Sequence, residues 1–193
     1  MPMSKGLKVF LFIVIVVLGA LFIVGGWVVR GYNKVVSLDE AVSAAWGQVE
    51  TQLQRRYDLV PNLVETVKGY ATHEREVFTQ ITKARAMVGS AQTIPDKIAA
   101  NTELTSALAR LLVVVENYPD LKASQNFLSL QDELAGTENR IAVARHRYNL
   151  AAKELNTFIK GIPGVVFARI RGTKEATYFG APEEAQKAPG VKF

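Results

Sequence analysis

The pattern of apolar positions along the chain predicts its longest helix between Ser124 and Lys160. Apolar residues recur there at alternating spacings of three and four, which is typical of a helix with one narrow buried seam of the coiled-coil type. Ser124 is a natural N-cap, and Gly161 followed by Pro163 is a natural stop, so a helix of roughly 55 Å is expected. The seam consists of Phe127, Leu130, Leu134, Thr137, Ile141, Ala144, Tyr148, Ala151, Leu155 and Phe158, and it contains no carboxylate, His or Cys.

A second pattern, the uncharged run from Val9 to Val29, follows a short basic leader at residues 1–8. At 1.5 Å per residue the run measures about 32 Å, which is enough to cross a hydrocarbon core of roughly 30 Å. A cleaved signal peptide is the alternative, but its apolar core is normally only about 7 to 15 residues long. We therefore predict a retained single-pass transmembrane helix at residues 9–29, with Trp27 at the interface. The flanking charges nearly balance and leave the orientation open, although we favour an extracytoplasmic domain.

Between these two elements, apolar spacing predicts three further helices. One covers about residues 37–56 and continues from the transmembrane segment with little or no loop, and residues 58–61 form a tight connection or a kink because Pro61 disfavours helical geometry before it. A second helix runs from Leu63 to Gly89, and a third follows Ile94-Pro95 and ends before Tyr118-Pro119. No segment alternates with period two, so strands are not expected.

The expected fold is therefore all-α, with a transmembrane helix followed by an antiparallel, up-and-down bundle of four long helices. The alternative has three long helices, the first of them kinked at Pro61. The bundle is assigned to residues 30–172. Residues 173–193 are expected to form an irregular apolar tail that packs on the bundle or on a neighbouring molecule, because Pro182 and Pro189 exclude a long helix there.

Composition and charge exclude several functional classes. The formal net charge of +5 includes Lys5 and Lys8 of the leader, which leaves 21 basic and 18 acidic residues from Arg30 onward. This small excess, without a basic stripe studded with aromatic residues, argues against nucleic-acid binding. The chain has no Cys, and therefore no disulfide, thiolate metal site or Cys nucleophile.

Candidate catalytic residues are few. His73-Glu74 begins like a zinc-protease motif, but position 77 is Val where the second histidine ligand would stand. His146 lies off the seam and is interpreted as solvent-exposed. A membrane-associated hydrolase is favoured only if Arg55, Asp58, His73 and Glu74 converge in a cleft, so we predict no catalytic residue, no metal site and no cofactor.

Several longer motifs resemble those of the LemA family. They cover nearly everything after the apolar run, and they include Tyr32-Asn33, Ala45-Trp46-Gly47-Gln48-Val49, the stretch from Gln54 to Val64, Val67-Lys68-Gly69-Tyr70-Ala71, Ala84-Arg85-Ala86, the stretch from Glu116 to Lys122, the stretch from Glu133 to Ile141, and the closing Ala188-Pro189-Gly190-Val191-Lys192-Phe193. The segment from Gly161 to Gly172 departs from the family pattern. The resemblance implies an N-terminal membrane segment and an antiparallel all-helical bundle, and it supplies no catalytic residues. We expect the protein to reside in the bacterial cytoplasmic (inner) membrane.

We interpret the motif residues as structural. Large side chains are expected to be core or contact residues, charged ones to form polar pairs between helices, and apolar tail residues to cover the bundle or a neighbour. The core or contact residues are Trp46, Tyr70, Tyr118 and Phe127. The charged residues of the polar pairs are Arg55, Arg56, Asp58, Glu133, Glu138 and Arg140. The apolar tail residues are Tyr178, Phe179 and Phe193.

The predicted function is a membrane-anchored helical scaffold or self-assembling structural protein. Its expected partners are the lipid bilayer and further copies of itself, because apolar residues beside the seams widen the apolar face of the bundle. A large assembly is one form that this association can take. A binding module for a partner membrane protein is the alternative, and the hydrolase is the least favoured hypothesis.

Overall fold

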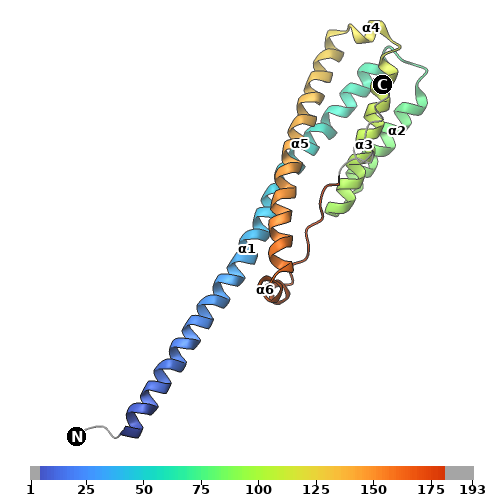
Figure 1. The fold of residues 1–193 in the computed structure, drawn as a ribbon. Coiled ribbons are helices and arrows are strands. Elements are labelled where there is room, and N and C mark those ends of the chain that lie inside the picture. The colour runs from blue at the N-terminus through green and yellow to red at the C-terminus, as the bar shows by residue number, and fades with distance from the viewer. Residues whose placement is uncertain (1–4, 181–193) are drawn as a thin grey trace, which may run out of the picture. The chain divides into compact units, whose positions relative to one another are not determined.

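The computed structural model describes residues 5–180, and within this range every regular element is helical (Figure 1). Residues 1–4 and 181–193 lie outside the described part. The prediction of an all-α chain with a long apolar N-terminal helix is confirmed. The helices are α1 (Lys5–Lys68), α2 (Arg75–Ser90), α3 (Ile94–Val115), α4 (Pro119–Lys122), α5 (Gln125–Lys160) and α6 (Gly164–Arg171).

The chain divides into two compact units. The first contains the residues up to Ser43 together with Ala151–Ala176, and the second contains Ala44–Leu150 together with the residues from Thr177 on. Helices α1 and α5 each contribute to both units. In the second unit the end of α1, α2, α3 and the beginning of α5 alternate in direction along the chain, which is the up-and-down order expected for the bundle (Figure 1).

Helix α1 continues through Pro61 without interruption, which contradicts the predicted tight connection at residues 58–61 and agrees with the alternative in which the first long helix passes through Pro61. A proline inside a helix removes the N–H that would bond the carbonyl four residues earlier, here that of Tyr57. Arg85 of α2 supplies a substitute donor, because its Nε donates to the Tyr57 carbonyl at 3.5 Å and its guanidinium lies 4.1 Å from the Tyr57 ring centroid. A side chain from a neighbouring helix thus makes the proline tolerable.

The chain turns instead between Lys68 and Arg75, inside the segment that we predicted as one helix from Leu63 to Gly89. Glycine is a poor helix former, and Gly69 follows the last residue of α1. The amide of Ala71 still donates to the Val67 carbonyl at 2.9 Å, and the Ala71 side chain is fully buried in the core. The apolar spacing continues past the turn, which is why the break is invisible to a periodicity argument.

The two predicted helices with clear caps are confirmed. The hydroxyl of Thr93 accepts a hydrogen bond from the amide of Asp96 at the start of α3, with Pro95 in the first turn. Helix α5 has the expected bounds. Two short helices, α4 and α6, were not predicted, because elements of four and eight residues are too short to show a period.

The seam of α5 is buried along most of its length, although its register drifts near the end. The drift follows from geometry, because 3.6 residues per turn do not match a strict seven-residue repeat. Ala152 and Ile159 are accordingly more buried than their predicted neighbours Ala151 and Phe158. Thr137, the one polar seam residue, is fully buried and donates its hydroxyl to the Glu133 carbonyl at 2.8 Å.

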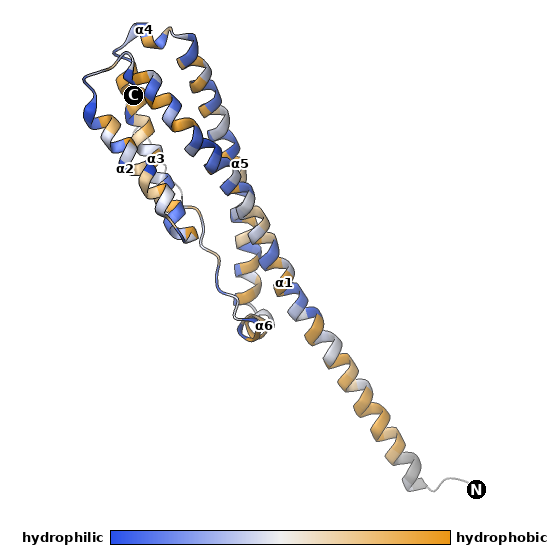
Figure 2. Cartoon of the chain, turned by 180° about the vertical axis from the view of Figure 1, so that it is seen from behind, coloured by the Kyte–Doolittle hydropathy of each residue, from blue (hydrophilic) through white to orange (hydrophobic). Residues whose placement is uncertain are grey.

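The core of the second unit draws on α1, α2, α3, α4 and α5. Its most deeply buried members include Val67, Ile81, Leu104, Leu111, Leu121 and Phe127. Figure 2 shows the corresponding pattern of hydropathy: apolar residues alternate with polar ones in this part of the chain, whereas α1 is apolar on all sides near its beginning. The N-terminal part of α1 thus lacks the polar face of an ordinary surface helix.

Candidate functional site

The most unusual side chain of the second unit is Arg56 of α1, which is only 2% exposed. Its Nη1 donates to Glu138 Oε1 of α5 at 2.6 Å and to Thr105 Oγ1 of α3 at 2.8 Å. Its Nη2 donates to the side-chain oxygen of Asn101 at 2.6 Å and to the carbonyl of the same residue at 3.2 Å. One guanidinium therefore links three helices.

This buried charge is satisfied almost completely. Asn101 is itself buried and donates to the Lys97 carbonyl at 2.8 Å, which fixes the orientation of its amide. The Nε of Arg56 is the one group of the guanidinium without a hydrogen-bond partner among the described residues. Burying a guanidinium costs free energy unless the group is paired. The network therefore defines how α1, α3 and α5 are aligned with one another in the core.

The neighbouring Arg55 pairs with Glu133 of α5 at 2.8 Å, and both side chains are about half exposed. Both arginines thus contact acidic side chains of another helix. Asp58 does not form such a pair, because it accepts from Gln54 of its own helix at 2.9 Å. The same is true of Arg140, which donates to Thr137 within α5 at 3.4 Å.

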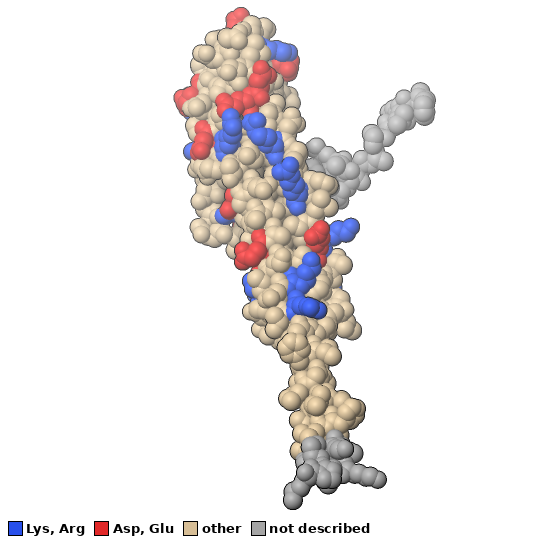
Figure 3. All heavy atoms as spheres, turned by 90° about the vertical axis from the view of Figure 1, so that its left-hand side faces the viewer, with Lys and Arg blue, Asp and Glu red and all other residues tan. Residues whose placement is uncertain are grey.

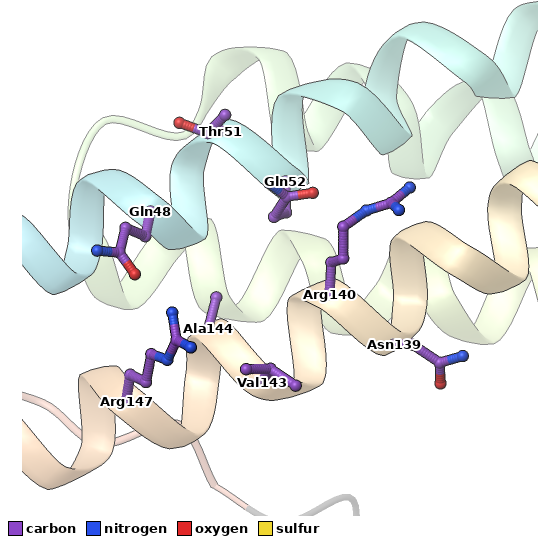
Figure 4. A pocket seen from close by; sticks show the side chains of 8 residues that line it. All are labelled: Gln48, Thr51, Gln52, Asn139, Arg140, Val143, Ala144 and Arg147. Atoms are coloured by element: carbon purple, nitrogen blue, oxygen red, sulfur yellow. The ribbon is translucent and has the colours of Figure 1, made fainter.

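A basic groove lies between α1 and α5 in the second unit (Figure 4). It has a volume of about 500 Å³ and is lined by Gln48, Thr51, Gln52, Asn139, Arg140, Val143, Ala144 and Arg147. Figure 4 shows Arg140 and Arg147 reaching from α5 toward α1, next to Gln52 and Gln48. The lining includes two guanidinium groups and no carboxylate, and the buried Oε1 of Gln52 has no hydrogen-bond partner within residues 5–180. Such a groove suits an anionic group that also carries an N–H or O–H donor.

An aromatic cluster holds the tail of the chain against the second unit. The Trp46 ring stacks on Phe179 at 5.8 Å and meets Tyr148 edge-on at 5.3 Å. Arg145 covers the other side, with its guanidinium 4.7 Å from the Phe179 ring centroid. Burial raises the pKa of Tyr148 and lowers that of Arg145, where the charge of Glu138 opposes the shift. The predicted contact residues Trp46 and Phe179 are therefore both buried here.

Polar side chains of α5 bind the backbone of the same tail. The amide group of Asn149 accepts from the Phe179 N–H at 3.0 Å and donates to the Phe179 carbonyl at 3.1 Å, so that it pairs like a neighbouring strand. Tyr148 donates its hydroxyl to the Thr177 carbonyl at 2.8 Å, and Arg145 donates to the Gly180 carbonyl at 3.0 Å. We call this set the tail latch of the second unit.

The first unit repeats the arrangement with Asn156. Its side chain accepts from the Ala176 N–H at 2.8 Å and donates to the Ala176 carbonyl at 2.8 Å. Sequence analysis did not identify either asparagine. The available signal was their separation by seven residues, each directly following a seam residue, Tyr148 or Leu155.

The described part of the tail thus packs on its own chain, which was one of the two predicted arrangements. Residues 173–180 form no helix or strand. Tyr178 is exposed, in contrast to its neighbour Phe179. Phe193 lies outside the described residues.

The remaining predicted contact residues divide between core and surface. Phe127 is fully buried, whereas Tyr70 lies in the turn after α1 and is 47% exposed. Tyr118 is half-buried and donates its hydroxyl to Glu74 at 3.0 Å. That hydrogen bond to a carboxylate raises the pKa of Tyr118.

The residues considered for a hydrolase do not form a common site in the described part of the chain. Arg55 pairs with Glu133, Asp58 with Gln54, and Glu74 with Tyr118. His73 is exposed in the turn before α2. Within residues 5–180 no group of three His, Asp or Glu side chains is arranged to hold a metal ion.

A further interhelical ion pair joins α1 and α3. Lys97 of α3 donates to Glu50 of α1, and both side chains are partly exposed. This hydrogen bond is the main reason why the pKa of Glu50 is lowered from its ordinary value. Because exposed ion pairs contribute little to stability, the pair orients the helices more than it stabilises them.

The beginning of α1 has the length and composition of a membrane-crossing helix. Its large apolar side chains from Phe10 to Val29 are exposed except for the partly buried Val14, and Figure 3 shows a stretch without charged side chains at the N-terminal end of the coloured part of the chain. In water such a surface would be unfavourable, because burial of apolar area is the main force that stabilises folded chains. A lipid environment removes that cost. Helix α3 also passes the length and hydropathy test for a span, but seven of its residues are buried in the protein core.

Sequence comparisons place these features among known proteins. A sequence profile of the LemA family matches residues 45–193, which confirms the resemblance found in the motifs. Magnetosome protein MamQ 1 of Paramagnetospirillum magneticum is 29% identical over 174 residues, covering 77% of this chain and 64% of the relative. Magnetosome protein MamQ of Magnetospirillum gryphiswaldense is 27% identical with the same coverage. Protein LemA of Metamycoplasma hominis is 25% identical over 163 residues, covering 82% and 72%. The chain thus spans about 64% of the length of these MamQ relatives.

Proposed function

Since the chain belongs to the LemA family, we propose that it is a single-pass membrane protein whose helical bundle acts as a self-associating scaffold. The bacterial cytoplasmic membrane is the proposed location, with the bundle on the extracytoplasmic side. Relatives that are named after a cellular structure, the magnetosome, favour an organising role over a reaction on a small molecule.

The observation that carries this proposal is a set of exposed apolar residues on α5. Leu128, Val143 and Leu150 are exposed, although the seam of the same helix is buried, and Val143 also lines the basic groove. Val143 and Leu150 are seven residues apart and therefore lie on one side of the helix. Exposed apolar residues that share a face mark an interaction surface, and attachment to one membrane raises the effective concentration of identical domains.

The experiment measures the mass of the assembly. Full-length protein is solubilised in detergent and studied by light scattering over a concentration series, next to the double variant Val143→Glu with Leu150→Glu. We expect the unmodified protein to be oligomeric. The mass of the double variant should be several-fold lower, because like charges that face one another across an interface repel.

The matched control is His146→Glu, an exposed position between the two substituted ones. It should leave the mass unchanged if contact depends on the apolar pair. A monomeric unmodified protein at all concentrations would refute self-association, and an effect of the control equal to that of the double variant would refute the role of Val143 and Leu150.

The basic groove supports a second candidate function, a binding module for a partner membrane protein. Its two guanidinium groups and the unpaired Gln52 Oε1 fit an acidic peptide segment, whose carboxylates accept and whose backbone N–H donates. Replacing Arg140 and Arg147 by Glu should then abolish binding of an acidic peptide in fluorescence anisotropy. Retained binding by that variant would exclude the groove as the peptide site.

A further inference from the structure

Helix α6 packs closely against α1 in the first unit. The ring of Phe167 lies 5.2 Å from the ring of Trp27, in an edge-on contact. A Cβ added to Gly31 would lie 2.0 Å from Phe167, so only glycine at that position allows the two helices to approach so closely. Arg171 at the end of α6 pairs with Asp39 of α1 at 3.0 Å. These contacts fix α6 beside the segment of α1 that follows the apolar run.

The other side of α6 carries an exposed apolar stripe. Ile162, Val166 and Ile170 are spaced by four residues, and they are 93%, 51% and 65% exposed. Val166 and Ile170 are four residues apart on α6 and therefore lie on one face of it, and Ile162, which precedes the helix next to Pro163, is the most exposed of the three. The face of α6 that carries Phe167 is well packed. The exposed apolar patch on its other side is therefore the informative feature of this helix.

The position of α6 along α1 explains what the stripe contacts. Trp27 lies two residues before the end of the uncharged run at Val29, where an aromatic residue is expected at the membrane interface. Because Phe167 touches Trp27, α6 lies at the same depth. In Figures 1 and 2 α6 is seen nearly along its own axis, whereas α1 is seen from the side, so α6 runs across the direction of α1.

The charges near this helix are those of an interfacial segment. Arg169 is exposed on α6, and Arg30 and Lys34 are exposed on α1 just after the apolar run. Helices that lie in the membrane interface combine an apolar face with basic residues that contact anionic headgroups. A helix of eight residues is too short to cross a bilayer, but it is long enough to lie in its surface.

We propose that α6 is a second membrane contact: Ile162, Val166 and Ile170 insert into the headgroup region of the bilayer that α1 crosses. The inference rests on the proposed membrane anchoring and extends it. A helix fixed to α1 at interface depth restricts the rotation and tilt of this part of α1 in the bilayer. This function requires that the apolar stripe contacts lipid rather than a second copy of the chain.

Because the chain has no native Cys, single cysteines can carry an environment-sensitive fluorophore without interference. We would label full-length Val166→Cys and Ile170→Cys with NBD and reconstitute them in vesicles of phosphatidylcholine and phosphatidylglycerol. Val16→Cys within the apolar run is the control for lipid exposure. Val113→Cys on α3, where the native side chain is 70% exposed, is the control for water exposure.

The expected result is quenching by spin-labelled lipid at positions 166 and 170 that exceeds quenching at position 113 several-fold, with a blue-shifted emission. Quenching at position 16 but not at 166 or 170 would overturn the inference and leave the anchor intact. A blue shift at 166 without lipid quenching would also overturn it, because protein would then cover the stripe. Absence of quenching at position 16 would refute the membrane anchor itself, and with it the premise.

Discussion

Residues Phe10–Val29 and residues Ala44–Lys68 belong to one helix, α1, but their side chains are suited to different surroundings. The first stretch is apolar on every side and exposed, and it contains no charged residue. The second has a narrow buried face, and the largest fully buried side chain on that face is an arginine. The two stretches thus share one helical backbone, but the exposed stretch has no charged side chain and the other has a charged side chain in its buried face.

The difference shows that a charge is tolerated according to its partners and not according to burial alone. Arg56 is stable in a dry core because Glu138, Thr105 and Asn101 supply acceptors for its N–H groups. No comparable acceptor surrounds the exposed apolar stretch within the described residues. An arginine is therefore essential in one part of α1 and is expected to be disruptive in the other.

Removing the buried charge should produce the largest effect. Arg56→Met is expected to lower the free energy of unfolding by about 3 to 5 kcal/mol, because it leaves Glu138 and Asn101 without their partner. The partial exposure of Glu138 places the expected loss near the lower limit. Urea unfolding of the full-length protein in detergent, followed by circular dichroism, measures it.

Arg55→Met is the matched control for that experiment. It removes a neighbouring ion pair of similar length whose side chains are about half exposed, so the expected loss is below about 1 kcal/mol. Equal losses for the two variants would contradict the view that burial and the acceptors around Arg56 distinguish it.

Introducing a charge into the apolar stretch tests the other half of the comparison. Val16→Arg should cost roughly 2.5 to 3.5 kcal/mol on membrane-insertion scales and reduce the fraction of protein that integrates into membranes. Val143→Arg, at an exposed position of α5, should leave integration unchanged. Extraction of membranes with alkaline buffer measures the fraction, and full integration of the Val16 variant would disprove the membrane-crossing assignment.

The parts of the fold that follow from periodicity were predictable from sequence. The bounds of α5 and α3 depend on runs of apolar positions and on caps such as Thr93, all of which are local. The path of α1 through Pro61 was predicted only as the alternative fold, because the donor that replaces the missing N–H belongs to Arg85, which lies 28 residues from Tyr57 in the chain. A local rule for proline cannot include a donor supplied by another helix.

The candidate site shows the same division. Arg55 and Arg56 were identified as polar residues between helices, but their sequence context is alike and only the structure shows that Arg56 is buried and Arg55 exposed. The tail latch was missed because an asparagine that binds a backbone has no distinctive spacing with its target, which lies 30 residues further along the chain. Helix α6 was too short to be recognised.

The two asparagines provide the finest comparison between the units, because the same side chain binds the tail once in each. Asn156 pairs with Ala176 in the first unit and Asn149 with Phe179 in the second. Each forms two hydrogen bonds with a net worth of about 0.5 to 1.5 kcal/mol apiece, so either change to alanine should loosen its part of the tail by about 1 to 3 kcal/mol. The measurement is hydrogen exchange of the backbone amide that donates to each asparagine side chain, namely the amide of Ala176 or of Phe179.

Asn149→Ala should speed exchange at the Phe179 amide less than Asn156→Ala speeds exchange at the Ala176 amide. Phe179 stays buried against Trp46 after its asparagine is lost, whereas the Ala176 side chain has only a methyl group to bury. Each loss of 1.4 kcal/mol in the free energy of local opening speeds amide exchange tenfold. The expected accelerations are therefore on the order of ten-fold for Phe179 and up to about a hundred-fold for Ala176. Asn139→Ala, an exposed asparagine of the same helix, should change neither. Asn149→Ala could instead accelerate exchange at the Phe179 amide more than Asn156→Ala accelerates exchange at the Ala176 amide. The aromatic cluster would then contribute little to holding the tail, and the hydrogen bonds of Asn149 would be its main attachment.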